Sequence, residues 1–148
     1  MDAFDADVLI YAAMPGHPLG RRVAALFPAT AIPLAAAKVG VGSALLVPEL
    51  LGKPLRDEDA VTVTALSWFL GQLSLWPADG SIAAHAAVLG AKYELHAPDA
   101  THLATAIKMG AHRFITNNSK DFVKSIKEVE VTYPADLPDP GRPRPRAG

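Results

Sequence analysis

Four acidic residues stand where predicted strands end or where the following helices begin. Asp5 ends the first predicted strand, and Glu49 lies on the helix after the second. Asp99 opens a helix after the turn HAP, and Asp121 follows the strand HRFIT after a polar bend. Ligand sites of mostly parallel sheets lie at the carboxyl ends of their strands, so the four carboxylates could converge there. Their wide spacing along the chain does not by itself establish that they do.

A cluster of carboxylates has chemical consequences. Neighbouring negative charges repel one another and raise the pKa of each acid. Such a cluster is hard to justify as a stabilising device, so we expect a metal ion, protons or nearby lysines to neutralise it. Mg²⁺ is a hard cation that takes carboxylate oxygens and water as ligands. Metal ions at such a site can activate a water and stabilise a leaving oxygen in phosphodiester hydrolysis.

The stretch FITNNSKDF, residues 114–122, joins three apolar or β-branched residues to six positions that are rich in amide, hydroxyl and charged side chains. This composition is compatible with a surface loop. It is equally compatible with the lip of an active site, where a strand ends and polar side chains point into a cleft. The residues alone leave both interpretations open.

The elements that must position these side chains alternate between strand and helix, which predicts an α/β sheet that is mostly parallel. Residues 8–14 could form a helix or a second half-strand, because periodicity does not separate the two in so short a run. Ser43 is a plausible N-cap for the helix that carries Glu49, and Gly110 is expected to end the helix that Asp99 opens. The stretch Ala29–Ala36 is long and rich in alanine. Strands are predicted near residues 3–5, 37–42, 74–79, 112–116 and 129–133, and helices at 16–27, 43–52, 56–73, 81–95 and 97–110.

Length and composition predict one globular domain. The chain has 148 residues, of which 50% are apolar, and a formal net charge of -1. That charge is weak evidence against a stoichiometric RNA-binding protein and says little about an enzyme that meets RNA briefly. Because the chain has no cysteine, disulfides, thiolate catalysis and Cys-type zinc sites are excluded. The acidic N-terminus and the lack of a long apolar run predict a cytoplasmic protein with no membrane association.

Three segments of the chain carry a resemblance to a known family. FDADVLIYA, GSALLVPELL and APDATHLATAIKMGAHRFITNNSKDF resemble, in order, the successive motifs of the PIN domain, most closely those of VapC-type toxins. The match runs from Phe4 to Phe122. Its most specific part is an acid that opens a D-A-x-x-L-A-x-A helix, followed by a glycine, a strand and T-x-N-x-x-D-F.

The resemblance implies a three-layer α/β/α PIN-like fold, with a mostly parallel central sheet flanked by helices. It also implies a ribonuclease that uses Mg²⁺ or Mn²⁺ and is the toxin of a type II toxin–antitoxin pair. The partners it implies are an RNA substrate, a cognate antitoxin and a second copy in a homodimer. The metal-binding carboxylates and catalytic residues would be Asp5, Glu49, Asp99 and Asp121, and supporting polar roles would fall to Thr116 and Asn118.

The chain departs from the family pattern after the first acid. The family usually has Thr or Ser there and then Asn or Ser, whereas this chain has Ala6 and Asp7. Ala6 lacks the hydroxyl group. Asp7 adds a possible fifth acid, which could bind metal in a supporting role or simply face water. Asn118 can donate and accept hydrogen bonds without adding charge to a crowded acidic cluster.

Other residues allow both a functional and a structural interpretation. His102 could be a general base, although a packed or hydrogen-bonded histidine is the commoner case. Lys120, Lys124 and Lys127 could hold RNA phosphates or could form an ordinary solvated face, and Arg142, Arg144 and Arg146 pose the same choice. Trp68 and Phe69 are expected to pack in the core or against another chain rather than to stack on bases, since the helix they occupy is apolar nearly all round.

The sequence predicts one folded domain with a C-terminal tail and leaves two alternative functions open. Residues 1–133 are expected to form the PIN domain, and residues 134–148, rich in proline and arginine, a flexible tail. One alternative function is a PIN fold that has lost catalysis and acts as a binding module. The other is a haloacid-dehalogenase-like phosphatase with Asp5 as nucleophile, which FDADV and FIT also resemble. That family needs further acids and a lysine downstream, for which the chain offers only a short segment.

Overall fold

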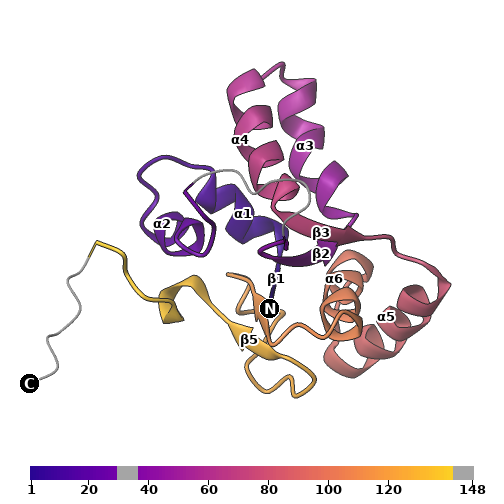
Figure 1. Cartoon of the computed structure of the whole chain (residues 1–148). Helices are drawn as coiled ribbons and strands as arrows, with labels where there is room; N and C mark the ends of the chain where they lie inside the picture. The colour runs from indigo at the N-terminus through magenta and orange to yellow at the C-terminus, as the bar shows by residue number, and fades with distance from the viewer. Residues whose placement is uncertain (30–36, 142–148) are drawn as a thin grey trace, which may run out of the picture.

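The computed structural model describes residues 1–29 and 37–141 (Figure 1). Most of the stretch Ala29–Ala36, and the three arginines Arg142, Arg144 and Arg146, lie outside these residues. The strands are Asp2–Phe4 (β1), Gly40–Ser43 (β2), Leu73–Trp76 (β3), Arg113–Ile115 (β4) and Glu130–Thr132 (β5). The helices are Ala6–Ala12 (α1), Pro18–Ala24 (α2), Leu46–Arg56 (α3), Ala60–Gly71 (α4), Gly80–Tyr93 (α5), Ala97–Lys108 (α6) and the 3₁₀ helix Pro134–Asp136 (η1).

The strands form one parallel sheet in the order β3-β2-β1-β4-β5. The chain first builds the sheet outward from β1 through β2 to β3 and then places β4 on the other side of β1. The strand order therefore reverses between β1 and β4. In open α/β sheets the crevice at such a reversal, outside the carboxyl ends of the strands, is where ligands bind. Asp5 and Thr116, which directly follow β1 and β4, lie at that point.

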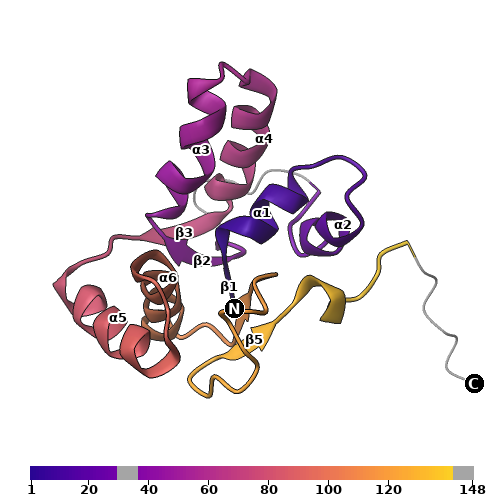
Figure 2. The same cartoon turned by 180° about the vertical axis from the view of Figure 1, so that it is seen from behind.

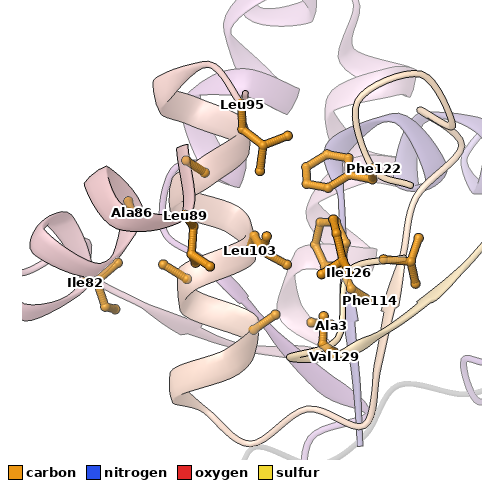
Figure 3. Packing of buried hydrophobic residues seen from close by; sticks show 14 of the residues in the cluster. Ala3, Ile82, Ala86, Leu89, Leu95, Leu103, Phe114, Phe122, Ile126 and Val129 are labelled. Atoms are coloured by element: carbon orange, nitrogen blue, oxygen red, sulfur yellow. The ribbon is translucent and has the colours of Figure 1, made fainter. Parts of the chain in front are cut away.

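Helices cover both faces of the sheet (Figures 1 and 2). Successive strand residues point to opposite faces, and two hydrophobic clusters divide accordingly. Ala3 and Phe114 pack with α5 and α6, whereas their neighbours Phe4 and Ile115 pack with α1, α3 and α4. Figure 3 shows the first cluster, in which the Phe114 and Phe122 rings lie 4.9 Å apart. The predicted three-layer α/β/α architecture is confirmed.

Local differences from the predicted elements have simple causes. Residues 6–12 are a helix rather than a second half-strand. The prediction that Ser43 is the N-cap of α3 is wrong. Ser43 is the last residue of β2 and pairs with Trp76. The helix begins three residues later, at Leu46, without a side-chain cap. Gly110 follows α6 with φ +73°, as expected of a glycine that ends a helix.

Helix α4 is only partly covered by the rest of the chain. Leu66, Phe69 and Leu70 are buried, and Trp68 packs edge-on against Phe69. Val61, by contrast, is 81% exposed. The expectation that Trp68 and Phe69 serve packing is confirmed, while the exposed side of α4 remains available for another chain.

The C-terminal segment is packed beyond the expected boundary at residue 134. Pro134 begins the 3₁₀ helix, and Leu137 is only 2% exposed because it joins the cluster beside α1 and α2. The Arg22 guanidinium donates hydrogen bonds to the carbonyl oxygens of Ala135 and Leu137, at 3.1 and 2.8 Å. The boundary at 134 therefore falls inside the packed part of the chain.

None of the helices in the described part of the chain has the length and apolar character that a membrane span requires.

Candidate active site

Asp5 is fixed at the end of β1 by three hydrogen bonds. Its backbone amide donates to the Ile115 carbonyl oxygen at 2.9 Å, which continues the pairing of β1 with β4. Its carboxylate caps α1 by accepting from the Ala6 amide at 2.8 Å, and it also accepts from the Thr116 hydroxyl at 2.8 Å. Asp5 is 6% exposed and Thr116 is fully buried. Thr116 therefore contacts Asp5 directly, a partner that the sequence did not name.

The bend after β4 links Thr116 to Asp121. The Asn118 amide donates to the Thr116 hydroxyl at 3.1 Å, and the Asn118 side chain donates to the Asp121 carboxylate at 3.0 Å. The Asp121 amide donates back to the Asn118 side chain at 3.3 Å. Phe122 is fully buried against Phe114 and anchors the bend. A continuous hydrogen-bonded chain thus runs from Asp121 through Asn118 and Thr116 to Asp5.

Asp7 also lies at this junction. It occupies the first turn of α1, and its Oδ2 accepts from the Asn117 backbone amide at 3.0 Å. Its Oδ1 is buried without a hydrogen-bond partner. Burial and the charge of Asp5 raise the pKa of Asp7 to about 7. Asp7 therefore belongs electrostatically with Asp5 and does not simply face water.

Asp99 reaches the same edge of the sheet from α6. It lies in the first turn of that helix, which His96 precedes without a side-chain cap and Pro98 helps to start. Burial and the charges of Asp5 and Asp121 raise the pKa of Asp99, so the carboxylates are close enough to repel one another.

Glu49 is held to the site by His102. Glu49 lies in the first turn of α3, and its side chain is 32% exposed. His102 lies one turn after Asp99 on α6, and its Nε2 is 3.1 and 3.0 Å from the two carboxylate oxygens of Glu49. Sequence analysis singled out His102 but did not identify Glu49 as its partner, because the two residues stand on helices that cover opposite faces of the sheet.

The structure therefore gathers Asp5, Asp7, Glu49, Asp99 and Asp121, which we call the acidic centre. Burial raises the pKa of Asp5, with the charge of His102 and the Thr116 hydrogen bond opposing it. Within residues 1–29 and 37–141, the ion pair of Glu49 with His102 is the only one that reaches these acids. The remaining carboxylates need protons or a cation.

The donor set of the acidic centre fits a divalent metal ion in its chemistry. Carboxylate oxygens are the ligands that Mg²⁺ and Mn²⁺ prefer, and the unpartnered buried Oδ1 of Asp7 shows that hydrogen bonding does not satisfy the cluster. Across the described residues, no three His, Cys, Asp or Glu side chains are already arranged to hold an ion. The carboxylates would therefore have to draw together around it.

The three lysines near the bend, Lys120, Lys124 and Lys127, have different surroundings. Lys124 pairs with Asp136 and lies over the Tyr133 ring, so its charge is used within the chain. Lys120 is exposed beside Asp121, and both line a hollow of about 580 Å³ that Lys92 and Tyr93 also border. Lys127 is exposed on the same segment. Lys120 is thus the lysine best placed to meet a ligand of the acidic centre.

Comparisons with known proteins identify the family of the chain. A sequence model of the PIN domain family matches residues 3–127. No curated protein matches the chain.

Three solved structures share the fold. The first, a toxin–antitoxin complex from Klebsiella pneumoniae, has a chain with 23% identity and a TM-score of 0.70, covering 93% of this chain and 100% of that one. VapBC2 from Rickettsia felis, bound to a DNA fragment from its promoter, gives 16% identity and a TM-score of 0.65 over 89% of this chain and 97% of the other. FitAB bound to the IR36 DNA fragment gives 22% identity and a TM-score of 0.62 over 93% and 98%.

Proposed function

Since this chain belongs to the PIN domain family, we propose that it is a metal-dependent endoribonuclease that hydrolyses RNA phosphodiester bonds with an activated water. The observation that carries the proposal is the hydrogen-bonded chain from Asp121 through Asn118 and Thr116 to Asp5. It fixes two carboxylates at the reversal of strand order, where α/β sheets bind ligands. Asp99 faces the same pair from α6.

In this proposal Asp5, Asp99 and Asp121 hold Mg²⁺ or Mn²⁺, and Glu49 completes the carboxylate set. A divalent ion bound there supplies an activated water and stabilises the leaving oxygen. Thr116 and Asn118 orient Asp5 and Asp121 through hydrogen bonds, and Asp7 adds negative charge beside Asp5. The buried surroundings of Asp5 keep bulk water away from that carboxylate. No covalent enzyme intermediate is required.

The exposed Lys120 supports RNA as the substrate. Phosphates are contacted chiefly by Lys and Arg side chains, which position the backbone without reading sequence. Lys120 and Asp121 line the same hollow, so the Lys120 ammonium could contact a phosphate of an RNA strand that enters it. This local charge is compatible with the overall net charge of -1.

We further propose that the chain is the toxin of a type II toxin–antitoxin pair and acts in the cytoplasm. Three similar structures are a toxin–antitoxin complex, VapBC2 and FitAB. A cognate antitoxin would place a basic side chain against the unneutralised carboxylates of the acidic centre. The exposed side of α4, where Val61 is 81% exposed, supports a homodimer.

A catalytically inactive binding module is the second candidate. It is favoured by one observation, that within the described ranges no three potential ligands already stand at metal-holding spacing. The phosphatase alternative has no such support, because family membership assigns FDADV and FIT to the PIN fold.

Cleavage of total RNA by the purified chain tests the proposal. We expect mapped cleavage sites with Mg²⁺ or Mn²⁺ and none with chelator. Asp99→Asn keeps the size of the side chain and should stay folded, yet lose metal-dependent cleavage. Full activity of that variant would refute the assignment. Failure of Mn²⁺ to bind the folded wild-type chain in isothermal titration would favour the binding module.

A further inference from the structure

His102 makes an unusual contact for a buried side chain. It is 3% exposed, within a helix whose neighbouring residues Leu103 and Ala104 are fully buried. Its Nε2 lies at hydrogen-bond distance from both oxygens of Glu49, and an ionised carboxylate can only accept, so the ring donates. Its Nδ1 is buried with no partner. Glu49 is therefore the only hydrogen-bond partner of this imidazole within the described residues.

The bond joins the two helical layers across the edge of the sheet. His102 belongs to α6, which packs with α5 on one face, and Glu49 belongs to α3, which packs with α1 and α4 on the other. A polar group buried for packing alone costs free energy that an apolar residue would not. The hydrogen bond to Glu49 explains why a histidine, and not an apolar residue, is buried where the two helical layers meet.

Glu49 needs such a contact to stay at the acidic centre. Its neighbours Leu46 and Leu50 are buried, but Glu49 itself lies on the exposed side of α3. Its carboxylate has no other hydrogen bond in the part of the chain that the structure describes. A glutamate has three rotatable side-chain bonds, so without a fixed partner it would spread over several rotamers in water.

The charges of the site point the same way. Among residues 1–29 and 37–141, His102 is the only basic side chain within 4.0 Å of a carboxylate of the acidic centre, which it reaches through Glu49. Glu49 is therefore the one acid of the centre that a basic side chain holds in the described part of the chain.

We propose that His102 is a positioning residue that holds the Glu49 carboxylate at the acidic centre, ready to join the ligands of a divalent cation. The inference rests on the proposed function, since it assigns a task within the same site. It does not make His102 a general base or a metal ligand. The Nε2–H of His102 fixes the Glu49 carboxylate, and Glu49 binds the metal ion less well without that hydrogen bond.

Isothermal titration of Mn²⁺ alone into the full chain tests the proposal. His102→Leu removes the donor and fills the space with an apolar side chain. His102→Gln keeps an N–H donor near the place of Nε2, whereas the shorter His102→Asn does not. Loss of a hydrogen bond to a metal ligand typically weakens metal binding 10–100-fold. We therefore expect the Mn²⁺ dissociation constant to rise about tenfold or more in the Leu and Asn variants, and to stay within about threefold of wild type in the Gln variant.

A double-variant cycle separates positioning from general damage to the fold. In a Glu49→Gln background, His102→Leu should change Mn²⁺ affinity no further, because its target carboxylate is already gone. Circular dichroism checks that each variant remains folded. If His102→Leu does not fold, the comparison of His102→Gln with His102→Asn tests the proposal.

The possible outcomes distinguish the inference from the function it rests on. Wild-type affinity in His102→Leu, or a Gln variant as weak as the Asn variant, overturns the inference alone. An equal loss caused by His102→Leu with and without Glu49 does the same. If the folded wild-type chain binds no Mn²⁺ at all, the proposed function and this inference fall together.

Discussion

Four of the five carboxylates of the acidic centre fall into two kinds. Asp5 and Asp7, the inner acids, lie at the junction of β1 with β4 and accept hydrogen bonds from Thr116 and from the Asn117 backbone. Glu49 and Asp99, the outer acids, stand on α3 and α6, and neither is buried. Donors at the strand ends hold the inner acids at the cost of burial, whereas the Glu49 carboxylate is more exposed and is held, among the described residues, by His102 alone. Substitutions of inner acids should therefore affect stability and function together, and those of outer acids mainly function.

Asp5→Asn should have the largest effect and gives the first test of this comparison. A metal ion contributes several kcal/mol of transition-state stabilisation, and each 1.4 kcal/mol is tenfold in rate. We expect single-turnover RNA cleavage to fall about 1000-fold in Asp5→Asn and clearly less in Glu49→Gln, because Asp5 is buried and is held by both the Ala6 amide and the Thr116 hydroxyl. Equal losses in the two variants would show that the inner and outer acids are equivalent.

Asp7→Asn should stabilise the metal-free chain in a pH-dependent way. The folded-state pKa of Asp7 is raised from 3.8 to about 7, so the folded chain holds a proton that the unfolded chain releases. Wild-type stability therefore falls as pH rises from about 4 to about 7. With one pKa unit equal to about 1.4 kcal/mol, Asn at this position should raise the free energy of unfolding by a few kcal/mol at pH 8.

Urea unfolding in the presence of chelator measures this difference at pH 4 and pH 8. The two proteins should be nearly equal at pH 4, where Asp7 is largely protonated in the folded chain. Asp99→Asn should show a smaller difference of the same sign, because burial and the charges of Asp5 and Asp121 also raise the pKa of Asp99. A pH-independent difference between Asp7→Asn and wild type would contradict the prediction.

Thr116→Val should have the smallest effect of the three. The substitution keeps the shape of a fully buried side chain but removes the donor to Asp5 and the acceptor for the Asn118 amide. Leaving buried polar groups unpaired costs about 1–3 kcal/mol each, and we expect a loss near the lower end, measured by thermal or urea unfolding. Mn²⁺ affinity should fall by less than tenfold.

The chain offers a matched control on the neighbouring strand. Thr132 is 5% exposed at the end of β5, and its hydroxyl is buried without a hydrogen-bond partner. Thr132→Val should therefore be neutral or stabilising. If both valine variants lose the same stability, the hydroxyl of Thr116 does not support Asp5 in the way described.

Much of the fold followed from local pattern. The alternation of strands and helices predicted a parallel α/β sheet, and periodicity located α4, α5 and α6 within a few residues. Local pattern misplaced the start of α3, because Ser43 looks like an N-cap until β3 is known to pair with it. Nor does a run of prolines reveal that Leu137 packs beside α1.

The sequence by itself determined which acids were candidates and that a bend rich in amide and hydroxyl groups follows β4. These are properties of residue type and of neighbours within a few positions, so they can be seen without coordinates. Only the tertiary structure decided that Thr116 bonds to Asp5, that Asp7 faces the cluster, and that His102 bonds to Glu49. Each of these contacts joins residues 53 to 111 positions apart or depends on burial by distant segments. Such contacts depend on how the two helical layers pack at the edge of the sheet, and this packing cannot be read from the spacing of residues along the chain.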